Sequence, residues 1–370
     1  MKRLFCLLLV LCMLLCACGK KNAEVPTEPS VPATTTLPAT EATTETTTEA
    51  TEAPTEPSTE PLGQVNPLTG EPLEEVYTGR PVSFTINNIS GCLPQYGLDD
   101  LDWMFEAETE GGITRCVGIM TDPASAGAIG PIRSCRTYFL NISVSYNAPL
   151  FHCGGSAFSD AYKYSYTQSL SGWDHLDQMG NGGSYFYRDS NRYNNLGYAW
   201  EHTLFTSGEL LAEGMADKGF DQTSGEPVDY GYRFSEDPAL DGQAADSVTI
   251  QFLGGKDTTM KYDADSGLYK AHQHGKDWVD GETGENAAFR NILVVTTKQT
   301  KPENYHSFYE LDGTGDGYFA CGGKMIPIKW HHKDVDGPFR FTLEDGTPIT
   351  LGVGSTYCAI VSTNGSVTAE

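Results

Sequence analysis

Apolar and polar positions divide the chain into three regions. An unbroken apolar run from Leu4 to Leu15 follows two basic residues at the start. From Lys20 to residue 62 the chain consists mainly of Thr, Glu, Pro and Ala, with almost no large apolar residue. Short apolar segments separated by turn residues follow and continue to residue 364. The pattern predicts a leader, a spacer and a folded body.

Residues 1–18 have the layout of a secretory signal peptide. The apolar run is too short to cross a bilayer, and it ends in small residues. Its end, Leu15-Cys16-Ala17-Cys18-Gly19, resembles the lipobox of bacterial lipoproteins. The resemblance implies that Cys18 becomes a lipidated N-terminus and anchors the protein to the outer face of the cell membrane. Ordinary cleavage that leaves Cys18 free is the alternative.

Residues 19–65 are predicted to form a disordered stalk. A Thr/Glu/Pro tract buries too little apolar surface to offset the entropy of ordering. Repeated Glu extends such a chain by charge repulsion. The stalk is expected to act as a spacer, and a docking motif is the alternative.

Residues 66–226 alternate strand-like and helix-like segments, and form the N-terminal part of the body. Strands are predicted at Val82–Asn87, Trp103–Ala107, Ile113–Thr121 and Pro149–His152. Helices are predicted from Gly130-Pro131 to about Ser145, from Ser156 to about Tyr164, and from Ser207 to Lys218 with Gly219 as C-cap.

Residues 227–364 change to short β segments and form a β-rich C-terminal part, with residues 365–370 as a tail. Hairpin turns are predicted at Gly322-Gly323 and Asp345-Gly346. The predicted strands are Val248–Leu253, Leu268–His272, Ile292–Thr296, Tyr318–Cys321, Met325–Trp330, Phe339–Thr342 and Tyr357–Val361. The body is therefore predicted to be α+β.

The chain is strongly acidic, with a formal net charge of -25. Affinity for nucleic acid comes largely from clustered Lys and Arg, so nucleic acid is excluded as the main ligand.

Six of the ten cysteines lie in the body, at Cys92, Cys116, Cys135, Cys153, Cys321 and Cys358. An even number in an exported chain permits disulfides, but a body of this size does not need them. The sequence does not decide whether these six cysteines are buried thiols or form disulfides. No C-x-x-C pair is present, and no metal or cofactor is expected.

Two arginines, Arg133 and Arg136, fall in the first turn of the helix predicted from Gly130. Helix N-termini attract anions, so cations there suggest a bound anion. One interpretation is an anion site formed by both guanidinium groups and free backbone N–H groups. The other is that each Arg pairs with an internal acid such as Glu106 or Glu110.

Other polar residues are candidates for the same pocket. His152 ends a predicted strand just before Gly154, Gly155 and Ser156, and glycines at such a turn let a ligand approach the backbone. A structural role for His152 is the alternative. Arg188, Arg192 and His202 extend the anion pocket or close a salt-bridge network, and the sequence does not separate these possibilities.

Two acidic loops, at residues 263–267 and 312–317, lack the spacing and the closing Glu of a calcium loop. Both lie between β segments, so hairpin turns explain them better.

The body resembles the YerB-like lipoproteins, a family that carries a domain of unknown function. The resemblance runs from Asn66 to about Ser362, and it is most specific at residues 110–115, 129–136 and 152–156. It implies an envelope lipoprotein whose body is a three-layer sandwich of two sheets and a helical layer. It implies no reaction. Relatives have Ala at the positions of Cys135 and Cys153, which suggests a local disulfide.

Two hypotheses for function follow. The first is a surface module, without enzymatic activity, that binds an anionic envelope component or a partner protein through Arg133, Arg136, His152, Gly154, Gly155, Ser156, Arg188, Arg192 and His202. The second is a cell-wall polymer transferase or hydrolase, with Glu106 or Glu110 as base and His152 or His202 as acid. No catalytic nucleophile is marked in the sequence. The remaining alternative is that these polar residues only hold the fold together.

Overall fold

The computed structural model of the protein describes residues 64–155, 172–300, 307–333 and 337–370. The predicted signal peptide, Cys18 and the stalk up to residue 63 lie outside the described residues, as does the helix predicted from Ser156. Val65, at the predicted end of the stalk, already pairs with Pro72. All described residues belong to one compact unit, residues 57–370.

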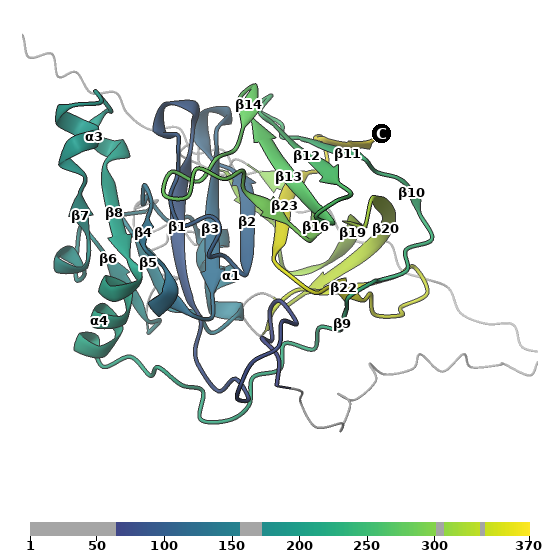
Figure 1. Ribbon diagram of the computed structural model, residues 1–370, viewed down its shortest axis with the longest axis horizontal. Coiled ribbons are helices and arrows are strands. Elements are labelled where there is room, and N and C mark those ends of the chain that lie inside the picture. Colours follow the sequence, from purple (N-terminus) through teal and green to yellow (C-terminus); the bar gives the residue numbers. More distant parts are fainter. Residues whose placement is uncertain (1–63, 156–171, 301–306, 334–336) are drawn as a thin grey trace, which may run out of the picture. The chain divides into compact units, whose positions relative to one another are not determined.

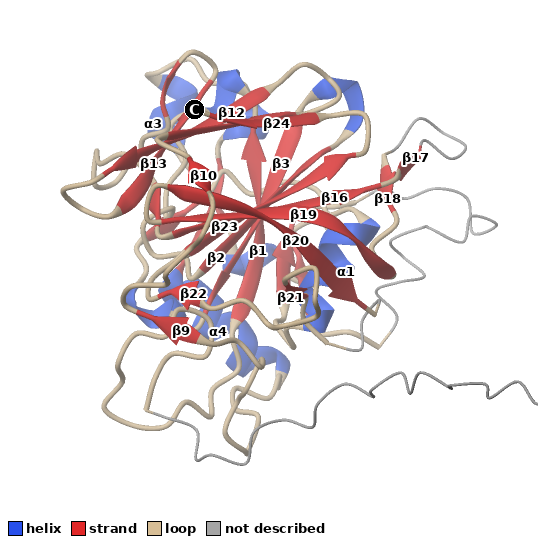
Figure 2. Ribbon diagram, turned by 90° about the vertical axis from the view of Figure 1, so that its right-hand side faces the viewer, coloured by secondary structure: helices blue, strands red, loops and turns tan. Residues whose placement is uncertain are grey.

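The main sheet has eleven strands and joins both parts of the body (Figure 1). Most neighbouring strands run antiparallel, but β23 runs parallel to both β16 and β2, and β5 runs parallel to both β1 and β6. The order is β10 (Gln243–Ala244), β20 (Lys324–His332), β19 (Gly313–Cys321), β16 (Asn291–Thr297), β23 (Thr356–Ser362), β2 (Trp103–Glu108), β3 (Thr114–Met120), β1 (Val82–Asn88), β5 (Leu150–His152) and β6 (His175–Asp177), with β21 (Arg340–Thr342) on β20. Figure 2 shows the twist that rotates these strands across the sheet.

A second sheet is built from the C-terminal part alone. Its order is β14 (Lys276–Asp277), β13 (Leu268–Gln273), β12 (Asp257–Asp263), β11 (Ser247–Gln251) and β24 (Ser366–Ala369), with β15 (Ala288–Phe289) on β13. Residues 366–369, which were expected to lie in a tail, are therefore a strand of this sheet. Smaller sheets pair β4 (Ala128–Ile129), β8 (Leu204–Ser207) and β7 (Tyr187–Arg188); β17 (Gln299–Thr300) and β18 (Phe308–Tyr309); and β22 (Leu351–Gly352) and β9 (Phe234–Ser235).

The helices of the described residues are short. They are α1 (Thr137–Ser145), α3 (Ser190–Asn194) and α4 (Gly208–Lys218), with 3₁₀ turns η1 (Ser90–Cys92), η2 (Glu110–Gly112), η3 (Pro123–Ser125), η4 (Gly183–Tyr185) and η5 (Trp200–His202). The predicted C-cap of α4 is confirmed, since Gly219 has a φ of 68°. Ser207, which was expected to be the first helical residue, is the N-cap, and its Oγ accepts from Leu210 N. No helix in the described part of the chain is long and apolar enough to cross a membrane.

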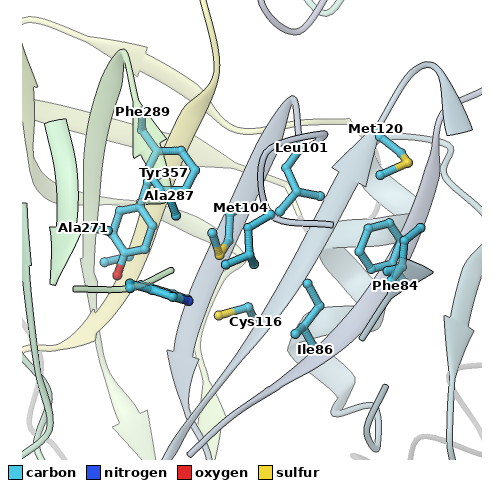
Figure 3. Close-up of a cluster of buried hydrophobic side chains, with 14 of the residues drawn as sticks. Phe84, Ile86, Leu101, Met104, Cys116, Met120, Ala271, Ala287, Phe289 and Tyr357 are labelled. Atoms are coloured by element: carbon cyan, nitrogen blue, oxygen red, sulfur yellow. The ribbon is translucent and has the colours of Figure 1, made fainter. Parts of the chain in front are cut away.

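Successive side chains on the central strands point to opposite faces of the main sheet, and each face carries one hydrophobic cluster. Met104 and Tyr357 point to the face that packs against the second sheet, and Figure 3 shows them with Ala271 and Phe289. Phe105 and Cys358 point to the opposite face, where α1 packs. This alternation with period two is what a sheet buried on both faces requires.

The fold is mostly β with few helices, consistent with the α+β class, and a three-layer sandwich over the whole body stays a prediction. The hairpin turn at Gly322-Gly323 is confirmed between β19 and β20. The acidic loop at residues 263–267 is the predicted turn, between β12 and β13. The second acidic loop is not a turn, because residues 313–317 already belong to β19.

Candidate functional site

The segment from Gly130 to Cys135 is extended, so the prediction of a helix starting at Pro131 was wrong. Backbone N–H groups of Ile132, Arg133 and Cys135 donate to Leu204 O, Thr85 O and Gly154 O, at 2.7, 3.2 and 2.9 Å. Residue 136 is still extended, and α1 begins at Thr137. These backbone N–H groups were expected to be free at a helix N-terminus and to bind an anion. They are instead hydrogen-bonded to other segments of the protein.

Arg136 is held inside the protein by Glu110. Its Nε donates to Glu110 Oε1 at 2.8 Å and its Nη2 to Oε2 at 2.5 Å, while Nη1 donates to Cys135 O at 2.7 Å. Such a two-pronged contact fixes both planar groups. The alternative prediction, that the arginine pairs with an internal acid, is therefore confirmed for Arg136. The other candidate acid, Glu106, pairs with Lys256 instead.

Arg133 is held much more loosely. Its Nη2 lies 3.9 Å from Glu201 Oε1, and their side chains are 30% and 55% exposed. Its Nε is buried and has no hydrogen-bond partner among the described residues. An exposed ion pair of this length contributes little, so much of the guanidinium's bonding capacity is left over.

Arg115, which the sequence pattern did not single out, lies beneath this region on β3. It is 3% exposed, and its Nη1 donates to Ser134 O at 2.7 Å. No carboxylate of the described residues forms an ion pair with it, and its Nε lacks a partner. Burial, together with the charges of Arg136 and Arg133, lowers the pKa of Arg115 to about 9. Arg115 is the last residue of segment 110–115, one of the segments that carry the family resemblance. This position was the sequence signal that could have identified Arg115.

Arg188 lies near Arg133 and stacks on an exposed aromatic ring. Its guanidinium carbon is 4.5 Å from the ring centroid of Trp200, and its Nη1 donates to Trp200 O at 2.6 Å. Burial lowers the pKa of Arg188, and so does the charge of Arg133. Trp200 is 54% exposed, and the ring of Tyr193 meets it edge-on at 5.3 Å. No sequence pattern had pointed to Trp200.

His202 is buried at the edge of this region. Its Nδ1 lies 2.9 Å from Asn87 Nδ2, which makes Nδ1 an acceptor. Burial lowers its pKa, with Arg133 and Arg192 acting in the same direction, so the neutral ring is favoured.

Two other candidates belong to the interior. Arg192 is 2% exposed, donates to Pro94 O and Cys92 O, and lies 4.1 Å from the ring of Tyr198. His152 is fully buried; its Nδ1 lies 2.8 Å from Gly154 O, and its Nε2 lies 3.2 Å from His175.

The glycine turn after His152 is built into the frame as well. Gly154 has a φ of 67° and donates its N–H to Asp177 Oδ1 at 2.7 Å. Gly155 pairs with Cys135. Ser156 lies outside the described residues.

The structure thus brings part of the predicted set together. We call this group the Arg133 surface, defined as Arg133, Arg188, Trp200, Glu201 and His202. Both carboxylates proposed as bases are already paired, Glu106 with Lys256 and Glu110 with Arg136. The arrangement can offer guanidinium donors and an aromatic face to a ligand.

The six body cysteines are free, so the suggested disulfide between Cys135 and Cys153 is not formed. Cys135 is buried with its Sγ directed at Arg136 O, and Cys153 lies 3.4 Å from Gln178 Oε1. No group of His, Cys, Asp and Glu in the described ranges has the arrangement of a metal site.

Comparison with known proteins places this arrangement in a family. The model for the N-terminal domain of proteins of unknown function DUF3048 matches residues 68–221, and the model for the C-terminal domain matches residues 248–358. The chain is 27% identical over 309 residues to "Putative lipoprotein YerB" of Bacillus subtilis (strain 168), covering 80% of this chain and 85% of that protein.

A crystal structure of the YerB protein from Bacillus subtilis has the same fold. It matches with a TM-score of 0.68 at 24% identity, over 82% of this chain and 99% of that one. The order of the two domains is also that of the family models. The chain belongs to the DUF3048 family, and it contains both the N-terminal and the C-terminal domain of that family.

Proposed function

We propose that the protein is a cell-surface lipoprotein, held at the outer face of the membrane by lipidated Cys18, that binds an anionic envelope polymer through the Arg133 surface. The observation that carries the proposal is the excess of guanidinium groups there. Arg133 and Arg188 lie close together, yet the only acid that contacts either of them within the described residues is Glu201, at 3.9 Å.

Electrostatics support an anionic ligand. The chain has a net charge of -25, so a local group of unneutralised cations is conspicuous against the rest of the protein. Buried Arg115 adds a third charge beneath the surface without an ion-pair partner among the described residues. A ligand carrying phosphate or carboxylate groups would offset the mutual repulsion of these guanidinium groups.

Exposed aromatic rings support a polymer with sugar rings. Trp200 and Tyr193 are 54% and 48% exposed, and their rings meet edge-on. Large exposed aromatic side chains beside arginine are typical of binding surfaces. An aromatic face packs against the apolar face of a sugar, while the guanidinium groups bind its acidic substituents.

Anchoring through Cys18 rests on the lipobox-like sequence and on the name of the Bacillus relative. Replacement of Cys18 by Ser should abolish metabolic labelling with a fatty-acid probe and release the protein from the membrane fraction. Labelling that persists in Cys18→Ser would show that another residue carries the lipid.

Polymer binding is best tested with the mature chain carrying Cys18→Ser. Poly(glycerol phosphate) and polygalacturonate supply phosphate and carboxylate, and dextran is the uncharged control. We expect Arg133→Ala plus Arg188→Ala to weaken binding of an acidic polymer at least about tenfold, since contacts to charged groups are lost. Arg233→Ala, an exposed arginine elsewhere, is the matched control.

Trp200→Ala separates stacking from charge. It should weaken binding of polygalacturonate more than binding of inorganic polyphosphate, which has no sugar ring. Equal binding by wild type and the double arginine variant would refute the polymer site. Binding of dextran as strongly as polygalacturonate would also refute it.

A further inference from the structure

A cleft of about 700 Å³ opens where turns of the second sheet meet loops of the N-terminal part. Its walls include the turn between β11 and β12, the turn between β13 and β14, and residues of η1 and η2. In Figure 1, β13 lies beside β23. None of its lining residues belongs to the Arg133 surface. The volume is in the range of small-molecule sites.

A buried ion pair lies at the inner end of this cleft, which we call the Lys256 cleft. Glu106 is fully buried, and its carboxylate accepts from Lys256, Thr114 and Tyr357. Burial raises the pKa of Glu106, but the charge and hydrogen bond of Lys256 outweigh this and leave the pKa lowered. Lys256 lines the cleft, and Glu106 is its ion-pair partner in the interior.

Gln273 provides the observation that points to a ligand. It lines the cleft and is 2% exposed, yet neither its Oε1 nor its Nε2 has a hydrogen-bond partner in the described structure. Buried side-chain amides are usually satisfied, and leaving both atoms unpaired is costly. The amide can therefore give one donor and one acceptor to a molecule in the cleft.

The rim of the cleft is positively charged. Lys261 and Lys276 are exposed, and no described acid forms an ion pair with either. Asp257 is the one acidic residue among those that line the cleft in the described chain. Such a rim attracts an anion in an otherwise acidic protein, and Lys is a common phosphate-binding residue.

Glycines bring the two parts of the body together at the cleft. A Cβ on Gly254 would lie 2.2 Å from the Cα of Gly112, so the two backbones touch. Gly254 N donates to Glu108 Oε2 at 2.5 Å, which fixes this contact. Gly255 has a φ of 85°, and a Cβ at this position would meet no atom of the described chain within 4 Å, so its backbone is open to a ligand.

We propose that the Lys256 cleft binds a small phosphate ester that carries an amide group. The phosphate lies at the rim near Lys276, which is paired with Gln273 across strands β13 and β14, and the amide pairs with the side chain of Gln273. This site is separate from the Arg133 surface, so either can exist without the other.

The test uses the mature chain with Cys18→Ser and N-acetylglucosamine 1-phosphate as probe, with inorganic phosphate and N-acetylglucosamine as its two halves. We expect binding by calorimetry, with the intact probe binding more tightly than either half. Gln273→Leu should weaken it about tenfold, and so should Lys261→Ala plus Lys276→Ala. Lys324→Ala, an exposed lysine on β20, and Arg188→Ala should leave it unchanged.

Folding of the variants serves as an independent readout. Gln273→Leu keeps the volume and removes two unpaired polar atoms, so its melting temperature should stay the same or rise while binding falls. Failure of the probe to bind the wild type would overturn the proposal. Binding that survives both the Gln273 and the lysine variants, or equal binding of neutral N-acetylglucosamine, would overturn it as well.

Discussion

Arginines near the Arg133 surface differ in how far the protein itself satisfies them. Arg136 has a carboxylate on two of its nitrogens, and Arg192 has two carbonyls and an aromatic ring. Within the described ranges, the acid that contacts Arg133 is distant and exposed. Satisfied groups gain nothing from a ligand, whereas the leftover donors of Arg133 do. The sequence shows the residue types but not these partners, because the carboxylates and carbonyls that bind the guanidinium groups lie far away along the chain.

His152 gives a prediction at this scale. Burial lowers its pKa to about 4 from about 6.5, although Asp177, 4.0 Å away, opposes the shift. Between these pH values the unfolded chain takes up a proton that the folded chain does not, so the free energy of unfolding falls as the pH falls. The contribution is roughly 3 kcal/mol.

Urea unfolding at a series of pH values between 4 and 7 measures this. His152→Gln should be less stable than wild type at pH 7 but should show a shallower loss of stability toward pH 4. His331→Gln, on β20 at the other side of the main sheet, is the control and should keep the wild-type slope. An unchanged slope in His152→Gln would contradict the assignment.

Helices show which elements local sequence can predict. The bounds of α4 were predicted almost to the residue, because Ser207 and Gly219 act on the helix through local hydrogen bonds and backbone conformation. The start of α1 was misplaced by several residues. There Pro131 and its neighbours pair with β1 and β8, which are distant in sequence. Strand β12 was not predicted, since it contains few apolar residues.

Contact between the η2 loop and the turn before β12 leads to a prediction at the scale of elements. Gly254→Ala places a Cβ against the backbone of Gly112, which cannot yield as a side chain would. We expect a loss of about 1–3 kcal/mol in the free energy of unfolding. Hydrogen exchange of residues 110–113 should become faster as this loop is displaced.

Gly255→Ala is the matched control for Gly254→Ala. It meets no neighbouring atom, so its cost comes only from the positive φ of 85° and should be about 1–2 kcal/mol. Exchange in residues 110–113 should stay at the wild-type rate. If both variants speed exchange there equally, the steric explanation fails.

At the scale of the whole molecule, the two family domains share one sheet. Strand β23 lies between β16 of the C-terminal part and β2 of the N-terminal part, with parallel pairing on both sides. The sequence pattern predicted most of these strands but not their order, which depends on contacts across the whole chain. The Lys256 cleft could not be predicted from the sequence for the same reason. Lys256 and Glu106 are 150 residues apart, and the strand order brings them together.

Sharing of the sheet predicts that the parts do not fold alone. A fragment of residues 64–226 lacks β23, so β2 keeps one neighbour and the apolar side chains of its outer edge lose their cover. We expect this fragment to give a poorly dispersed NMR spectrum and no cooperative unfolding. The mature chain should unfold in one transition, with fluorescence and circular dichroism midpoints that coincide.

Adding residues 227–370 as a separate chain tests whether the shared sheet is the cause. The two fragments should regain a dispersed spectrum when mixed, because β23 can then enter between β2 and β16. A 227–370 fragment with Ala359→Pro is the control, since proline removes a backbone donor in the middle of the sheet and should prevent the recovery. A folded 64–226 fragment, or recovery with Ala359→Pro, would show that the N-terminal part does not depend on β23.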